Sequence, residues 1–232
     1  MGSATIFQLL FNVIKGGSIM YYFKYFVQDQ QLSLLGKSFS FSYQSLTSTF
    51  LLVGTALTIL GAVMTNIFSK KFGKSRCYYG FLGIAAVATA FFYVLKPQDL
   101  ILMFVLQIIG SFAVGPVSVL QWAIYTDTAD YSDWKTGRRA TALIMAASLF
   151  CLKLGIALAG TFQAWVLDKY GFVANVAQSP PALNGIKLLM SIFPAIAGII
   201  GVALMVFYPL NNKMMVQIEK DLTARRKSIT TD

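Results

Sequence analysis

The sequence predicts an all-α membrane protein whose six transmembrane helices form one half bundle. Hydrophobic residues make up 56% of the chain and charged residues only 12%, about half the charged share of a soluble domain, and the mean hydropathy is +0.65. Six apolar runs are long enough to cross a bilayer, which takes about 20 residues. Because 232 residues leave no room for twelve spans, a transporter of the common twelve-helix kind could be present here only as one half.

The first three predicted spans cover about residues 4–26, 45–68 and 77–95. Each is an apolar run between polar or basic ends. The first also contains Asn12, Lys15 and the pair Gly16–Gly17, and the third is rich in glycine and alanine. Small residues of this kind let helices approach closely in a bilayer.

The other three spans cover about residues 100–125, 140–166 and 186–210, and a polar tail follows over 211–232. Pro116 lies in the fourth span and Pro194 in the sixth. Proline removes a backbone hydrogen bond inside a helix. Both prolines are therefore explained either by packing against neighbouring helices or by local bending.

The net charge of +10 is concentrated in loops on one side of the predicted bundle. Four basic residues lie in loop 69–76, three in loop 135–139 and five in the tail, against five on the opposite side. The positive-inside rule then places both termini in the cytoplasm of a cell-membrane protein. Because the basic residues flank apolar runs and form no stripe, we expect no nucleic-acid partner.

Two lysines are candidates for binding solute or cation, or for coupling the two. Lys153 lies about 13 residues, or near 20 Å, into the fifth span, and Lys15 lies about 11 residues into the first, one turn after Asn12. A lysine at such depth is costly and usually faces a cavity or a partner. The alternative is that a span is shifted and its lysine is interfacial.

The nine carboxylates all lie outside the predicted membrane interior: Asp29, Asp99, Asp127, Asp130, Asp133, Asp168, Glu219, Asp221 and Asp232. The two lysines therefore have no anionic partner at their own depth in this sequence. An unpaired charge in a bilayer is expensive. We expect the partner to be substrate, water or another polypeptide, such as a second six-helix half.

The most polar stretch is residues 125–139, at the end of the fourth span. Asp127 and Asp130 share a helix face, Asp133 follows, and Lys135, Arg138 and Arg139 come within reach. These six residues are predicted to form a charged latch at the cytoplasmic side. A solvated loop is one alternative. A Mg²⁺-dependent membrane transferase that uses the three aspartates is another, although such enzymes usually have a second acidic cluster.

The stretch from Asp127 to Arg139, followed by a span with Lys153, resembles the glycoside–pentoside–hexuronide:cation symporter family. Loop 68–76 is similar to the basic loop of the major facilitator superfamily, and residues 21–25 and 175–179 also resemble the family. The resemblance covers nearly the whole chain, but only the second half of the family, helices seven to twelve.

The resemblance implies secondary active transport of a sugar or glycoside in symport with Na⁺ or H⁺, by alternating access and without enzymatic activity, a metal or a cofactor. It matches Lys153 to a lysine near the sugar and cation sites, and Asp127, Asp130, Asp133 and Arg139 to a cytoplasmic gating network. Trp122 either stacks on the sugar or belongs to the aromatic belt. A non-transporting membrane subunit remains an alternative.

Overall fold

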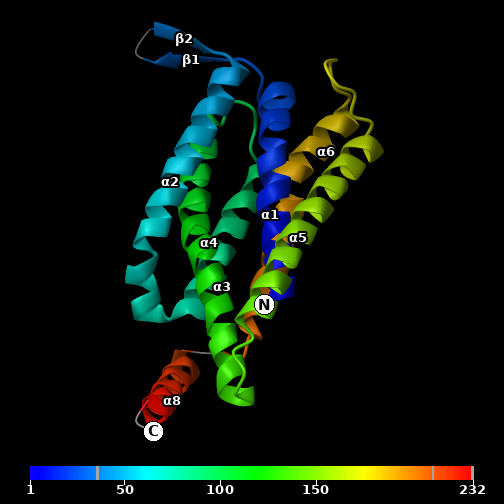
Figure 1. Ribbon diagram of the computed structural model, residues 1–232. Helices are drawn as coiled ribbons and strands as arrows, with labels where there is room; N and C mark the ends of the chain where they lie inside the picture. Colours follow the sequence, from blue (N-terminus) through cyan, green and yellow to red (C-terminus); the bar gives the residue numbers. More distant parts are fainter. Residues whose placement is uncertain (35–36, 211, 231–232) are drawn as a thin grey trace.

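The computed structural model describes residues 1–34, 37–210 and 212–230. Long helices run side by side in a bundle, with a short hairpin at one end and a helix across the other (Figure 1). The elements in chain order are α1 (Gly2–Tyr21), the π-helix η1 (Tyr22–Val27), β1 (Gln30–Leu34), β2 (Lys37–Phe41), α2 (Tyr43–Phe72), α3 (Lys74–Ala90), the 3₁₀-helix η2 (Phe91–Tyr93), α4 (Leu100–Thr136), α5 (Thr141–Lys169), α6 (Pro180–Met190), α7 (Ile192–Val206) and α8 (Asn212–Thr230).

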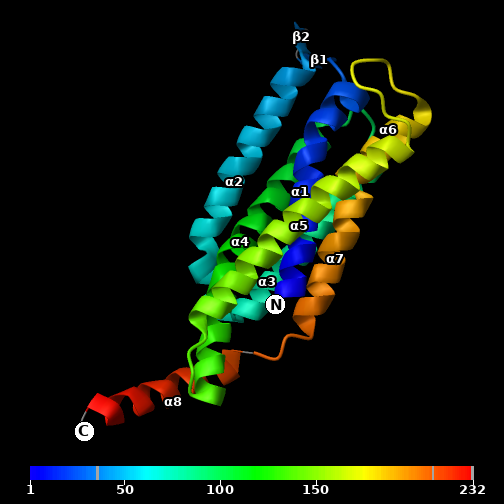
Figure 2. The same cartoon turned by 45° about the vertical axis from the view of Figure 1, so that its right-hand side comes forward.

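The predicted fold class, an all-α membrane half bundle, is confirmed. Four segments of the described chain are long and apolar enough to cross a membrane: α2, α4, α5 and the combined α6–α7 segment. The first and third predicted spans correspond to α1 and α3, which fall outside that set. They run alongside the others in the bundle (Figure 2), but α3 has only 17 residues and α1 contains Gln8, Asn12 and Lys15.

The sixth predicted span is two helices instead of one. Ser191 separates α6 from α7 with φ −127° and ψ −77°, and its hydroxyl donates to the carbonyl of Lys187 at 2.5 Å. Pro194 follows in the first turn of α7, where its ring excludes a normal helical bond to the preceding turn. The chain therefore leaves the regular helix just before this proline, and Pro194 is also buried in the bundle, so the structure shows both local bending and packing at this position.

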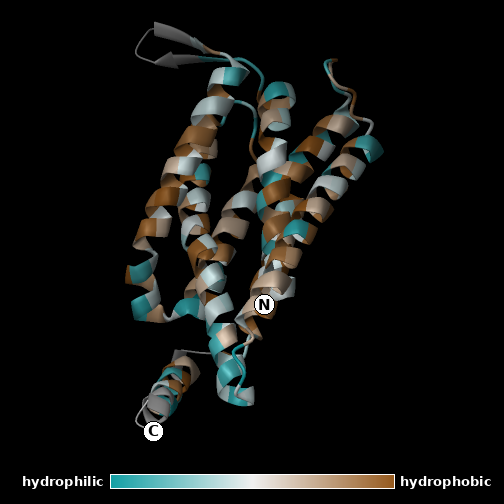
Figure 3. Ribbon diagram, viewed as in Figure 1, coloured by the Kyte–Doolittle hydropathy of each residue, from teal (hydrophilic) through white to brown (hydrophobic). Residues whose placement is uncertain are grey.

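Helix α4 continues past the predicted end of the fourth span and contains the whole acidic stretch. It ends at Gly137, whose φ of 71° lies in the left-handed region that favours glycine. The described part of the polar tail is helix α8, which lies across the foot of the bundle (Figure 2). Apolar residues lie along the bundle, and polar residues gather at its ends (Figure 3).

The hairpin of β1 and β2 was not predicted. The strands are antiparallel and pair Gln30 with Phe41 and Gln31 with Ser40. Ser42 then caps α2, because its hydroxyl accepts a hydrogen bond from the backbone N–H of Ser45 at 3.3 Å. The hairpin thus connects η1 to the start of α2 at the end of the bundle opposite α8 (Figure 1).

Glycines allow α2 and α4 to pack backbone against backbone. A Cβ on Gly115 would lie 2.6 Å from the Ala62 nitrogen, and a Cβ on Gly61 would meet the carbonyl of Phe112. The Thr58 hydroxyl bridges the pair by donating to the Ser111 carbonyl at 3.2 Å. Helix α1 packs instead on α5 and α7, and Gly155 of α5 sits against Leu9.

Two apolar clusters fill the bundle. One lies toward the hairpin end and includes Tyr22, Phe23, Phe50 and Phe92, which pack edge to face. The other lies nearer α8 and includes Phe11, Tyr78 and Leu82. Polar side chains that come between α1 and α4 are therefore enclosed by apolar packing.

Candidate functional site

The first part of the candidate site is a pair of ion pairs at the end of the bundle near α8, which we call the basic end because Lys70, Lys71, Lys74, Arg138 and Arg139 lie there. Lys74 opens α3 directly after Gly73, whose φ of 86° makes the sharp turn from α2. Its ammonium lies 2.6 Å from Asp127. Asp127 is only 8% exposed, so its carboxylate depends on this one cation for compensation.

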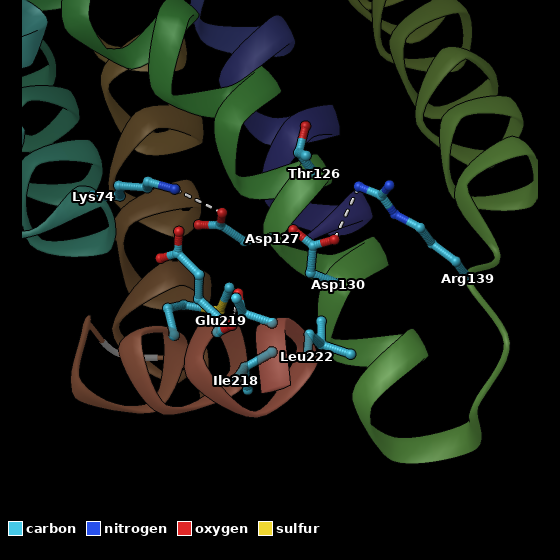
Figure 4. Close-up of a pocket in the computed structure, with 10 residues that line it drawn as sticks. Lys74, Thr126, Asp127, Asp130, Arg139, Ile218, Glu219 and Leu222 are labelled. Carbon is cyan, nitrogen blue, oxygen red and sulfur yellow. Dashed lines mark hydrogen bonds and ion pairs between the residues drawn. The ribbon is translucent and has the colours of Figure 1, made fainter. Parts of the chain in front are cut away.

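The second ion pair joins Asp130 to Arg139 at 3.0 Å. The two residues come together because α4 ends at Gly137 in a left-handed turn, which reverses the chain and returns Arg139 toward the last turns of α4. Figure 4 shows both pairs side by side, one on each side of α4. Asp127 and Asp130 share a helix face, as predicted, but each has a different partner.

The ion pairs border a pocket of about 380 Å³. Its other wall is α8, which contributes Met215, Ile218, Glu219, Leu222 and Thr223. Ile218 and Leu222 are buried, and the carboxylate of Glu219 adds a third negative charge near Asp127 (Figure 4). Helix α8 therefore closes the space beside the ion pairs.

Part of the predicted latch is not formed as expected. The Lys135 ammonium lies over the Tyr131 ring at 5.7 Å, and the hydrogen bonds described for Arg138 are made by its backbone, with Thr136 and Ser132. The turn at Gly137 brings Arg139 back to α4 and leaves Arg138 at the turn. Asp133 lies one turn beyond Asp130, nearer the helix end.

Sequence reasoning missed Lys74 as the partner of Asp127, and it missed α8. In the sequence, Lys74 is only one of the four basic residues of loop 69–76, and 53 residues separate it from Asp127. On α8, Met215, Ile218 and Leu222 recur at helical spacing, a pattern that could have revealed a docked amphipathic helix. The Trp134 indole N–H donates to Asp221 at 2.9 Å and ties α8 to α4.

Replacing Trp134 with phenylalanine should loosen α8 while leaving the bundle folded. The change removes one hydrogen bond to a carboxylate at a partly exposed position. A hydrogen bond of this kind stabilises the docking of α8 by about 1 kcal/mol. We expect amide hydrogen exchange in α8 to become about fivefold faster. Trp165→Phe is the matched control, because Trp165 is 58% exposed on α5. Equal exchange in the two variants would mean that this bond does not hold α8.

The second part of the candidate site is a set of polar side chains between α1 and α4. Lys15 is 9% exposed, and its ammonium donates to Gln107 Oε1 at 3.1 Å. Nearer the basic end, the Thr5 hydroxyl is hydrogen-bonded to the Tyr125 hydroxyl, which also accepts from the Gln121 amide at 3.1 Å. The two helices are thus joined through polar contacts inside an apolar bundle.

The structure does not bring the four predicted solute or cation residues together. Lys15 is enclosed by the chain, and Asn12, one turn away, is partly buried. Lys153 is exposed on α5, opposite the face with Gly155 and Ala159 that packs on α1. Trp122 is 47% exposed. Because only one side of α5 packs on α1, this half bundle encloses Lys15 and leaves Lys153 exposed.

The geometry does not favour the Mg²⁺-binding alternative. Asp127 and Asp130 are each occupied by a cation of the chain itself. Within residues 1–34, 37–210 and 212–230, no group of three acidic, cysteine or histidine side chains is placed to hold a metal ion. What the arrangement offers is a set of ion pairs between separate elements, which can break and form again as helices move.

Comparison with known proteins gives matches over most of the chain. Residues 4–212 match the family described as MFS/sugar transport protein. A putative 2,3-dihydroxypropane-1-sulfonate exporter of Escherichia coli K12 is 31% identical over 175 residues, 73% of this chain and 38% of that protein. A putative sulfoquinovose importer of Salmonella typhimurium LT2 is 30% identical over 171 residues, with coverage of 73% and 36%.

A putative glycoside/cation symporter of Escherichia coli K12, YagG, is 24% identical over 216 residues, which are 93% of this chain and 44% of that protein. The chain therefore spans less than half the length of these relatives. All three are named as transporters, which agrees with the expectation that the chain is not an enzyme.

Proposed function

Because the chain belongs to the MFS/sugar transport protein family, we propose that it is the second six-helix half of a secondary transporter. This transporter moves a sugar or glycoside in symport with Na⁺ or H⁺ by alternating access. The name of one relative supports a glycoside as the solute, and the names of two others give sulfoquinovose and 2,3-dihydroxypropane-1-sulfonate. The other half is supplied by a further six-helix bundle, since the relatives are more than twice as long as the matched segment.

The observation that carries the proposal is the polar character of α1. Thr5, Gln8, Lys15 and Ser18 are all buried on this helix, although the bundle around it is apolar. Polar groups inside a membrane bundle are costly, and they usually mark a solute or ion pathway. Lys15, Asn12, Lys153 and Trp122 are proposed as residues of that pathway, with α1 nearest its centre.

The basic end is proposed to be the cytoplasmic end, with both termini on that side, because basic loops are retained there. In this orientation the pairs Lys74–Asp127 and Asp130–Arg139 close the cytoplasmic side of the half bundle. Solute and cation drive the cycle only to the extent that they bind the open and closed conformations with different affinity. Opening requires that these ion pairs separate.

The test is solute uptake into sealed vesicles that contain this chain together with the amino-terminal half of a relative such as YagG. We expect uptake of a labelled glycoside or sugar acid that depends on a Na⁺ or H⁺ gradient and stops when the gradient is collapsed. Each half alone and the two halves of the relative are the controls. If the two halves of the relative take up solute and the mixed pair does not, the proposal is contradicted.

A further inference from the structure

Three buried polar side chains lie around Phe92, at the hairpin side of the bundle. The Lys15 ammonium is 5.4 Å from the centre of the Phe92 ring. The Tyr22 ring packs edge-on against Phe92, with centroids 6.3 Å apart. Thr89 is one turn before Phe92, at the end of α3. Tyr22 follows Lys15 by seven residues, close to two helical turns, so the two lie on one side of the chain.

The positive charge of Lys15 is not balanced by a carboxylate. Its ammonium can donate three hydrogen bonds, and the acceptor found in the described residues is the neutral Gln107 amide oxygen at 3.1 Å. The ion pairs Lys74–Asp127 and Asp130–Arg139 both lie at the basic end. Gly110 faces the ammonium, and a Cβ added there would be in van der Waals contact with Nζ at 3.6 Å, so α4 presents no side chain to the charge at this position.

The hydroxyl groups of Tyr22 and Thr89 are also unsatisfied. Both residues are 0% exposed, and neither hydroxyl has a hydrogen-bond partner in the described part of the chain. A buried hydroxyl without a partner usually destabilises a protein, and inside a bilayer there is little water to replace the partner. An uncompensated ammonium and the ring of Tyr22, whose hydroxyl is unpaired, both contact Phe92, and the second unpaired hydroxyl belongs to Thr89, one turn before Phe92.

We propose that Lys15, Tyr22 and Thr89 form a buried binding site for a single negatively charged group. The ammonium supplies charge and N–H donors, and each hydroxyl supplies one O–H donor, so the set is rich in donors and suits an anion. A cation would be repelled by Lys15, and a neutral ligand would leave its charge unbalanced. The group is either a small inorganic anion such as chloride or the acid group of an anionic solute.

The test measures thermal unfolding of the purified full chain in lipid nanodiscs. Sodium chloride or sodium bromide is compared with sodium sulfate at equal ionic strength, and sodium glucuronate is compared with glucose. At a chloride concentration about 100 times its dissociation constant, the wild-type midpoint should rise by about 5 °C. Lys15→Met should abolish this rise, whereas Lys169→Met, which removes an exposed lysine from the end of α5, should retain it.

Two further variants keep the test decisive if Lys15→Met does not fold. Tyr22→Phe and Thr89→Val each remove one hydroxyl at nearly constant shape, and each should reduce the rise. A rise with chloride and bromide assigns the site to an inorganic anion, and a rise with glucuronate alone assigns it to the acid group of a solute. No rise in any of these salts, or the same rise in the wild type and the substituted chains, would overturn the proposal. Because the readout is stability, its outcome does not depend on transport.

Discussion

Replacing Gly115 with alanine is expected to prevent the normal packing of α2 on α4. The added Cβ would meet the Thr58 carbonyl and would lie 2.6 Å from the Ala62 nitrogen and 2.9 Å from the Gly61 carbonyl carbon. These are backbone atoms, so no side chain can rotate away, and the two helices must separate. Overpacking of this kind costs about 1–3 kcal/mol, and here we expect the upper end or more.

The measurement is the thermal unfolding midpoint and the yield of folded chain in nanodiscs. Gly160→Ala is the matched control, because Gly160 is also inside a long apolar helix and a Cβ there would have no heavy atom within 4 Å. This control should match or slightly exceed the wild type, since alanine favours helix more than glycine does. If Gly115→Ala is as stable as Gly160→Ala, the close α2–α4 contact described here is wrong.

Replacing Lys74 with methionine is expected to open the basic end. The change leaves the buried Asp127 carboxylate without its counter-ion and next to the negative charges of Asp130 and Glu219. Breaking a fully buried pair costs about 3–5 kcal/mol. Since the Lys74 side chain is 42% exposed, we expect a smaller loss, about 1–3 kcal/mol, confined to the contacts among α3, α4 and α8.

Hydrogen exchange at the end of α4 and in α8 measures this effect, and exchange there should be at least fivefold faster than in the wild type. Lys70→Met is the control, since Lys70 is an exposed lysine in the last turn of α2, close to Lys74 in the sequence. The double variant Lys74→Met, Asp127→Asn should recover much of the loss, because the uncompensated carboxylate is gone. Equal exchange in Lys74→Met and Lys70→Met would show that the ion pair does not hold the basic end closed.

The helices that could be predicted are those that the hydropathy of a single contiguous stretch of sequence determines. A run of about 20 apolar residues has one stable arrangement in a bilayer, so α2, α4 and α5 follow directly from hydropathy. The break at Ser191, the π-helix η1 and the β1–β2 hairpin were missed. Hydropathy gives no sign of the break at Ser191, because the residues on both sides of it are apolar. The break lies in the backbone geometry alone.

In the candidate site too, a contact between residues close in the sequence could be predicted, and contacts between distant residues could not. The pair Asp130–Arg139 joins residues nine positions apart in the acidic stretch, and sequence spacing placed them within reach. The contacts Lys74–Asp127, Lys15–Gln107 and Trp134–Asp221 join residues 53, 92 and 87 positions apart. Such partners depend on how helices are arranged around each other, which a single sequence does not specify.

The most direct test of alternating access is the reactivity of a cysteine placed at Thr126, which is exposed and lines the pocket at the basic end (Figure 4). The two native cysteines, Cys77 and Cys151, are first replaced by serine. The chain is paired with a second half in sealed vesicles, and a membrane-impermeant maleimide is added at the basic-end side. We expect the labelling rate to change several-fold when solute and coupling cation are supplied together. A rate that is the same with and without them would contradict a basic end that opens and closes during transport.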